Sequence, residues 1–170
     1  PAGPGKDAAS IVAEIVKFRD ARKIPEGEII QAYGYDDTVM AKGELLNRGH
    51  LDAAFPKNPV MVNHVSMHGA VLNSAALKKY GITAETKTPP GGVIVRKDGS
   101  QEPWGLIMET AYLPVFAALP KPTPQQEIEF TRAAQLLYAS NGITTAQEGS
   151  TRAGDLAVMQ RAANAGANII

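Results

Sequence analysis

A short β-branched run between two helical segments constrains the fold of this chain more than any other feature. Ile143, Thr144 and Thr145 favour a strand over a helix. A long amphipathic segment ended by Asn-Gly precedes them, and a helical segment over residues 155–165 follows. Helix, strand, helix is typical of a parallel α/β layer, where ligands gather at the carboxyl ends of strands. Glu148 follows such an end, so we interpret it either as a solvated loop carboxylate or as part of an active-site rim.

Composition excludes several classes of function. Seventeen basic residues balance seventeen acidic ones among 170, and no Lys/Arg cluster with interleaved aromatics occurs, which argues against nucleic acid as a partner. Cysteine is absent, so disulfides, thiolate metal sites and a cysteine nucleophile are excluded together. No apolar run is long enough to span a membrane and no secretory leader opens the chain, so we expect a soluble, cytoplasmic protein. The chain begins with proline rather than methionine, and we expect it to be a piece of something longer.

The local patterns predict an alternation of helices and strands. Asp7 is the expected N-cap of a first helix, and the Asp98-Gly99 pair is the strongest hairpin signal. Thr123-Pro124 opens the long helix that leads to Gly142. Further strands are expected over residues 28–33, 59–65 and 93–96, with a last one beginning at residues 167–170. Further helices are expected over residues 48–55, from the region of His68 to Tyr80-Gly81, and over residues 106–119, where Pro114 bends the helix.

The histidines and the Asp36-Asp37 pair are candidate metal ligands that the sequence does not support as a site. His64 and His68 are four apart, but the segment around His64 reads as a strand, which does not place both rings on one helical face. A single Asp-Asp pair cannot supply a cation's full oxygen shell, so a capping or turn role is the better interpretation. His68 itself, at an expected strand-to-helix junction near Asn73, could reach a ligand or be hydrogen-bonded within its own turn.

Glu109 is the other candidate for chemistry. It follows Ile107 and Met108 and precedes Ala111 and Tyr112, all apolar or aromatic. A carboxylate within such a run turns outward, pairs with another group, or does chemistry with a shifted pKa. The sequence leaves these three alternatives open.

Several short sequence blocks follow one another in a recognisable order. The blocks are His50-Leu51-Asp52-Ala53, Pro59-Val60, His68-Gly69-Ala70, Asn73-Ser74-Ala75-Ala76-Leu77, Gly81-Ile82-Thr83, Pro90-Gly91-Gly92-Val93-Ile94-Val95-Arg96, Asp98-Gly99, Trp104-Gly105-Leu106 with Glu109 and Ala111, and Gly142-Ile143-Thr144-Thr145. In this order they resemble the amidohydrolase family 3 branch of the metal-dependent hydrolases, which includes N-substituted formamide deformylases and proteins labelled exoenzyme-regulatory. The resemblance covers nearly all the chain after about Gln31.

The resemblance implies an α/β fold made of two parts. Residues 1–122 would form an inserted, β-rich α+β lobe. Residues 123–170 would form a segment of a (β/α)₈ TIM barrel, with a helix, the second barrel strand, another helix and the start of a third strand.

The resemblance also implies a divalent metal, with zinc expected, in the full-length protein. The family's paired histidines of the first barrel strand and its later histidines and aspartate are missing here, so no metal ligand is expected in this chain and the chain alone should be inactive. By the same resemblance, Glu109 and Glu148 are candidate catalytic residues. His68, Asn73 and Trp104 are candidate substrate contacts, with His68 and Asn73 alternatively locking the lobe's own turns and Trp104 alternatively packing.

Two functional hypotheses remain from different classes. The first is a fragment of a metal-dependent hydrolase that cleaves C–N bonds of small amide-like substrates. The second is a non-catalytic binding or regulatory module that uses the same piece of fold. A nucleotide-dependent enzyme is disfavoured, because no phosphate loop is present. In either case an incomplete barrel leaves strand edges and apolar helix faces uncovered, so we expect self-association.

Overall fold

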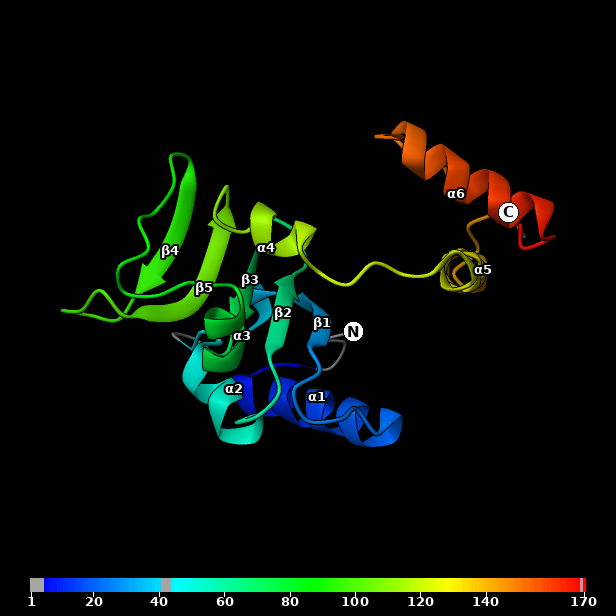
Figure 1. The fold of residues 1–170 in the computed structure, drawn as a ribbon. Helices are drawn as coiled ribbons and strands as arrows, with labels where there is room; N and C mark the ends of the chain where they lie inside the picture. Colours follow the sequence, from blue (N-terminus) through cyan, green and yellow to red (C-terminus); the bar gives the residue numbers. More distant parts are fainter. Residues whose placement is uncertain (1–4, 41–43, 169) are drawn as a thin grey trace. The chain divides into compact units, whose positions relative to one another are not determined.

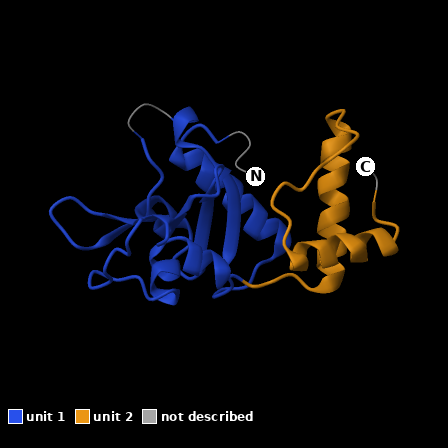
Figure 2. Cartoon of the chain, turned by 90° about the horizontal axis from the view of Figure 1, so that it is seen from above, with its two compact units in different colours: residues 1–119 blue, residues 120–170 orange. Residues whose placement is uncertain are grey.

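The computed structural model describes residues 5–40, 44–168 and 170. The chain divides into two compact units, residues 1–119 and 120–170, coloured blue and orange in Figure 2. The first contains a sheet with covering helices, whereas the described part of the second contains only helices and loops. The α/β class predicted from the sequence is therefore confirmed. The identities predicted for the two parts, an inserted lobe and a barrel segment, stay predictions.

A five-stranded sheet organises the first unit, in the order β1-β2-β3-β5-β4 (Figure 1). The strands are β1 (Ile30–Tyr35), β2 (Val60–His64), β3 (Gly69–Leu72), β4 (Gly92–Arg96) and β5 (Pro103–Glu109). β1 pairs in parallel with β2, and each following pair in the order is antiparallel. Consequently β1, β2 and β5 run in the same direction, and their last residues lie at one end of the sheet, which we call its carboxyl end.

Helices cover both faces of this sheet. α1 (Ala8–Arg22) and α2 (Arg48–Ala54) bury their apolar side chains against one face, and α3 (Ser74–Lys79) and α4 (Leu113–Ala117) against the other. In β2, Val60 and Val62 join the first core while Met61 joins the second, because successive strand residues point to opposite faces. The strand is buried on both faces over its first part, which agrees with the continuous apolar run Val60, Met61 and Val62.

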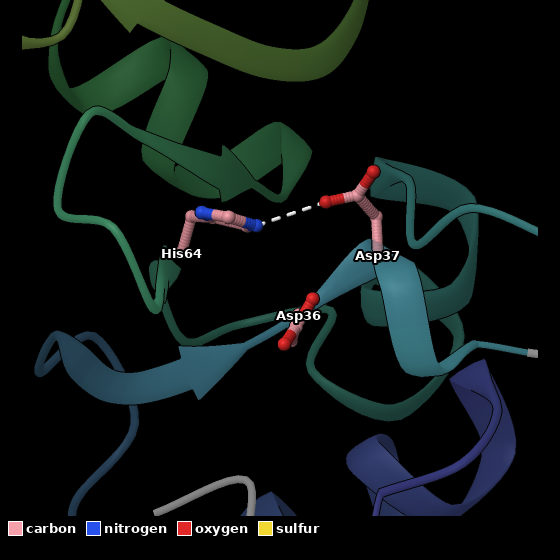
Figure 3. Close-up of side chains that lie close together, drawn as sticks. All are labelled: Asp36, Asp37 and His64. Carbon is pink, nitrogen blue, oxygen red and sulfur yellow. Dashed lines mark hydrogen bonds and ion pairs between the residues drawn. The ribbon is translucent and has the colours of Figure 1, made fainter.

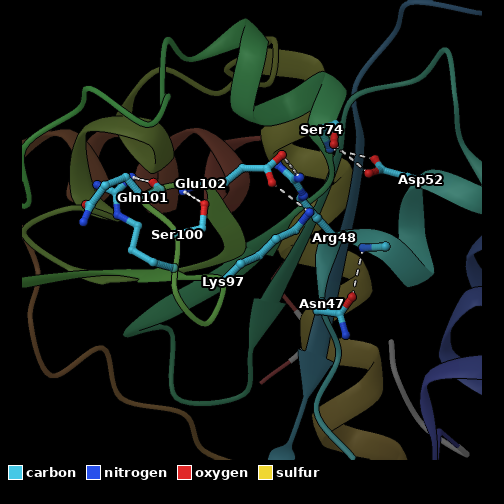
Figure 4. Close-up of polar contacts among 10 residues, drawn as sticks. Asn47, Arg48, Asp52, Ser74, Lys97, Ser100, Gln101 and Glu102 are labelled. Atoms are coloured by element: carbon cyan, nitrogen blue, oxygen red, sulfur yellow. Dashed lines mark hydrogen bonds and ion pairs between the residues drawn. The ribbon is translucent and has the colours of Figure 1, made fainter.

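Local signals account for several element boundaries. The predicted N-cap of α1 is confirmed, since an Asp7 carboxylate oxygen accepts the Ser10 amide at 2.7 Å. The predicted hairpin at Asp98-Gly99 is also confirmed: it joins β4 and β5, and the Lys97 amide donates to the Glu102 carbonyl at 2.9 Å. Figure 4 shows how Glu102 accepts from Lys97 and Arg48, which ties this hairpin to the start of α2.

Two predicted helices are corrected. Residues 106–109 belong to β5 rather than to a helix, and α4 begins only at Leu113. β5 forms a hairpin with β4 and also pairs with β3, which is distant in sequence, and this pairing outweighs the apolar run that suggested a helix. Likewise, residues 69–72 after His68 form β3, and the following helix begins at Ser74. His68 therefore lies in the turn between two antiparallel strands, not at a strand-to-helix junction.

The second unit contains α5 (Pro124–Ser140) and α6 (Ala153–Asn164). The predicted start of α5 is confirmed, with Thr123 and Gln126 forming a capping box. The predicted strand over residues 143–145 is not formed, and Ala167 and Asn168 are not in a strand either; Ile169 lies outside the described residues. A strand needs a neighbour to satisfy its backbone groups, and no strand is described in residues 120–168. None of the helices described in either unit is long and apolar enough to cross a bilayer.

Candidate functional site

Polar side chains collect at the carboxyl end of the sheet in the first unit. Asp36 and Asp37 follow β1, His64 ends β2, and Glu109 ends β5. Open α/β sheets place ligands at such ends. Glu109 also has a positive φ of 54°, which is uncommon outside glycine and occurs often at functional sites.

His64 is held by hydrogen bonds at both ring nitrogens. Its Nε2 lies 2.9 Å from Oδ1 of Asp37, the contact drawn in Figure 3, and its Nδ1 lies 2.7 Å from Oγ of Ser66. The backbone N–H of Ser66 also donates to Nδ1, at 3.1 Å. A nitrogen that accepts a backbone N–H carries no proton of its own, so the neutral ring has its proton on Nε2 and donates it to Asp37. Tyr35 packs edge-on against this ring, with centroids 5.8 Å apart.

Asp36 is fixed separately. Its Oδ1 accepts the backbone N–H of Thr38 at 2.9 Å and the hydroxyl of Thr38 at 2.6 Å, so it caps the 3₁₀ helix η1 (Asp37–Val39). These hydrogen bonds hold the pKa of Asp36 below its ordinary value, because they favour the ionised carboxylate. The capping role predicted for the Asp pair is thus confirmed for Asp36.

Asp36, Asp37 and His64 are also close enough to be considered as metal ligands. One donor atom from each lies within 4.8 Å of the others, and carboxylate with imidazole suits several divalent ions. A metal on Nε2 requires the ring proton on Nδ1, where the Ser66 amide already donates. The described hydrogen bonds therefore do not fit a metal at this cluster.

Sequence reasoning considered Asp36-Asp37 and His64 separately and missed their proximity. Asp37 and His64 are 27 residues apart, and the parallel pairing of β1 with β2 brings them together. The sequence did contain a signal for this proximity. The Asp pair follows one predicted strand and His64 lies near the end of the next, and neighbouring parallel strands place their last residues side by side. The sequence did not establish whether β1 and β2 pair in parallel or antiparallel.

His68 and Glu109, both predicted from the sequence, are brought together. Nδ1 of His68 lies 3.0 Å from Oε1 of Glu109, and the side chains are 63% and 47% exposed. Of the alternatives left open for Glu109, the structure has the carboxylate turned outward and paired. An exposed pair of this kind contributes little to stability. Because both side chains are exposed, a ligand can reach them.

Asn73 and Trp104 have contrasting environments. Asn73 is fully buried and caps α3, and all its hydrogen bonds are made within the fold, as predicted by the alternative that it locks the lobe's turns. Its contact with substrate stays a prediction. Trp104 is 38% exposed and lines a cavity of about 240 Å³ together with Asp37, His64 and Ser66. The Lys97 ammonium lies 5.7 Å from the centre of its ring.

Glu148 lies in the second unit, in the loop between α5 and α6. Its Oε1 accepts the Ser150 amide at 3.0 Å, and its carbonyl accepts the Thr151 hydroxyl at 3.1 Å. The strand whose end it was predicted to follow is not formed, and a catalytic role for Glu148 stays a prediction.

Comparison with known proteins identifies the family. The model of the family described as "Amidohydrolase family" matches residues 2–170. The chain belongs to the amidohydrolase family. It is 32% identical over 152 residues to N-substituted formamide deformylase from Arthrobacter pascens, a match covering 89% of this chain and 27% of that protein. It is also 32% identical over 118 residues to the Bacillus subtilis protein YtcJ, covering 69% of this chain and 22% of YtcJ. This amidohydrolase chain therefore spans about a quarter of the length of these relatives.

Solved structures agree on the fold. The crystal structure of an uncharacterized metal-dependent hydrolase from Pyrococcus horikoshii OT3 superposes with a TM-score of 0.57 at 18% identity, covering 96% of this chain and 29% of that one. A metal-dependent hydrolase from Pyrococcus furiosus gives a TM-score of 0.55 at 20% identity, covering 96% and 31%. The fold of this amidohydrolase-family chain is thus found as a part of larger proteins of that kind.

Proposed function

We propose that this chain is part of a metal-dependent amidohydrolase that cleaves the C–N bond of small amide-like substrates. The observation that carries the proposal is the 32% identity to N-substituted formamide deformylase over 89% of the chain. In this proposal residues 1–122 are the inserted lobe, and residues 123–170 belong to a (β/α)₈ barrel. Family membership implies a divalent metal in the whole protein, and we expect zinc, whose chemistry is to polarise a carbonyl and activate water.

The lobe's own residues would act on substrate rather than on metal. His68 and Glu109 form an exposed pair that can donate and accept hydrogen bonds, so they would contact a polar group of the substrate. Trp104 would contact an apolar part of it. Asn73 would support this surface from within, and Glu148 stays a candidate catalytic residue through the resemblance.

The chain by itself would be inactive, because its described Asp/His cluster does not fit a metal and the family's histidine pair is absent from the sequence. We also propose a cytoplasmic location, since a chain of 170 residues without cysteine fits a reducing compartment.

The test compares this 170-residue chain with the full-length protein. Metal content and hydrolysis of N-substituted formamides and of simple amides are measured for both. We expect stoichiometric zinc and amide hydrolysis in the full-length protein and neither in the chain. Turnover of an amide by the chain, or no amide hydrolysis by the metal-loaded full-length protein, would contradict the proposal.

A further inference from the structure

The cavity beside His64 has one polar end and otherwise apolar walls. Its walls include Leu45, Leu46, Val95, Leu106 and Met108, together with Trp104. Its volume of about 240 Å³ is below the ~300 Å³ at which pockets for drug-sized ligands begin, so it suits a small ligand.

Most hydrogen-bond acceptors at the polar end are already used. Both ring nitrogens of His64 are used, and the Ser66 hydroxyl lies against Nδ1 while accepting the His68 amide at 3.3 Å. The Tyr35 hydroxyl accepts the Leu46 amide at 3.3 Å, and burial raises the pKa of Tyr35, so it stays neutral.

Asp37 differs from these groups. Only its Oδ1 has a hydrogen bond among the described residues, to His64, which leaves Oδ2 as an acceptor. The Asp37 side chain is 52% exposed, so a ligand can reach its carboxylate. The residues lining the cavity, all of them described, include no lysine or arginine to neutralise it. What the polar end offers is therefore a negatively charged acceptor.

We propose that this cavity binds a small protonated primary amine that carries an apolar, preferably aromatic, body. The ammonium group would donate to Oδ2 of Asp37, a charge-assisted hydrogen bond. The neighbouring Asp36 carboxylate adds negative potential at the same end. The body would lie among the apolar walls and on Trp104, where aromatic contact and burial favour it. A neutral ligand of the same shape would gain only the second part.

Trp104 makes the inference directly measurable, because it is the only tryptophan among the 170 residues. The purified chain is titrated with 2-phenylethylamine and, separately, with 2-phenylethanol, which has the same body and a neutral head. We expect a saturable change in tryptophan fluorescence with the amine, and binding of the alcohol that is about tenfold weaker or more, the factor typical of losing a hydrogen bond to a charged group.

Two variants test whether the amine binds at Asp37. Asp37→Asn should weaken binding of the amine about tenfold or more and leave binding of the alcohol unchanged. Asp98→Asn, at an exposed turn carboxylate outside the cavity, should change neither. Non-saturating quenching by the amine, equal affinity for amine and alcohol, or an Asp37→Asn chain that binds the amine as tightly as the unmodified one would overturn the inference.

The comparison of the two ligands on the unmodified chain decides the question even where Asp37→Asn does not fold. Amide hydrolysis releases an amine, so the ligand class overlaps with a product of the proposed reaction. The titration measures no hydrolysis, however, and its failure would leave the proposed function standing.

Discussion

At the scale of single residues, Asn73 shows how a polar side chain can hold several elements together from within the core. Its Oδ1 accepts the amides of Val60 and Ala76, each at 2.9 Å. Its Nδ2 donates to the carbonyls of Phe55 and Asn58 at 3.0 and 2.9 Å. One amide group thereby satisfies backbone groups from the end of α2, the loop before β2, the start of β2 and the first turn of α3.

Replacing Asn73 with alanine should lower the free energy of unfolding by about 3 kcal/mol or more, because buried backbone groups would lose their partners at ~1–3 kcal/mol each. Urea unfolding monitored by circular dichroism measures this. The matched control is Asn47→Ala, which removes a half-buried cap of α2 and should cost about 1 kcal/mol. Equal losses in the two variants would show that the internal network of Asn73 contributes little.

The Glu102 carboxylate should make stability depend on acid pH. Hydrogen bonds from Lys97 and Arg48 lower the pKa of Glu102 from 4.5 to about 2. A group whose pKa is lowered by folding stabilises the native state above its unfolded pKa, and this contribution is lost as pH falls from 4.5 towards 2. At neutral pH the unmodified chain should therefore unfold at a higher temperature than Glu102→Gln, and the two unfolding temperatures should approach each other as pH falls over this range. A difference in unfolding temperature that does not change with pH would contradict the lowered pKa of Glu102.

At the scale of elements, the sequence predicted best those that local chemistry determines. The capped helices α1 and α5 and the Asp98-Gly99 hairpin were predicted correctly, since caps and turns lie within a few residues of the elements they bound. Residues 106–109 of β5 were predicted as part of a helix, because β3, one of the two strands with which they pair, is distant in sequence. The proximity of His68 and Glu109, and of Asp37 and His64, was missed for the same reason: strand pairing brings each pair together over 41 and 27 residues.

The close approach of β5 to its neighbours depends on Gly105. This residue has φ +116°, and a Cβ there would lie 2.8 Å from the Leu72 carbonyl oxygen and 2.9 Å from the Arg48 backbone nitrogen. Gly105→Ala should therefore lower the free energy of unfolding by at least ~1–3 kcal/mol, the usual cost of overpacking, with backbone strain added. Gly154→Ala is the control, because a Cβ there meets nothing within 4 Å and alanine favours the helix α6. The measurement is again urea unfolding, and similar midpoints for the two variants would count against this packing.

At the scale of the whole molecule, the two units differ in how well each buries its own apolar residues. The first encloses two hydrophobic cores around its sheet. In the second, no residue of α5 is buried, although the helix carries many apolar side chains. Large apolar residues of this unit that are exposed are Phe130, Leu136, Leu137, Tyr138, Ile143 and Leu156. The second unit therefore leaves apolar side chains exposed that its own described residues do not cover.

In the isolated chain, these apolar side chains should drive self-association, because contiguous exposed apolar surface is unfavourable in water. Sedimentation velocity over a range of protein concentrations should show a mass that rises above that of the monomer. Leu137→Glu, at a position 63% exposed on α5, should shift the distribution towards monomer by adding a charge to this surface.

Leu113→Glu is the matched control: Leu113 is 57% exposed at the start of α4, in the other unit, and its replacement should leave the association unchanged. If the unmodified chain sediments as a monomer at every concentration, the exposed apolar side chains of α5 do not drive self-association. If both variants dissociate the chain equally, the contact is not specific to the second unit.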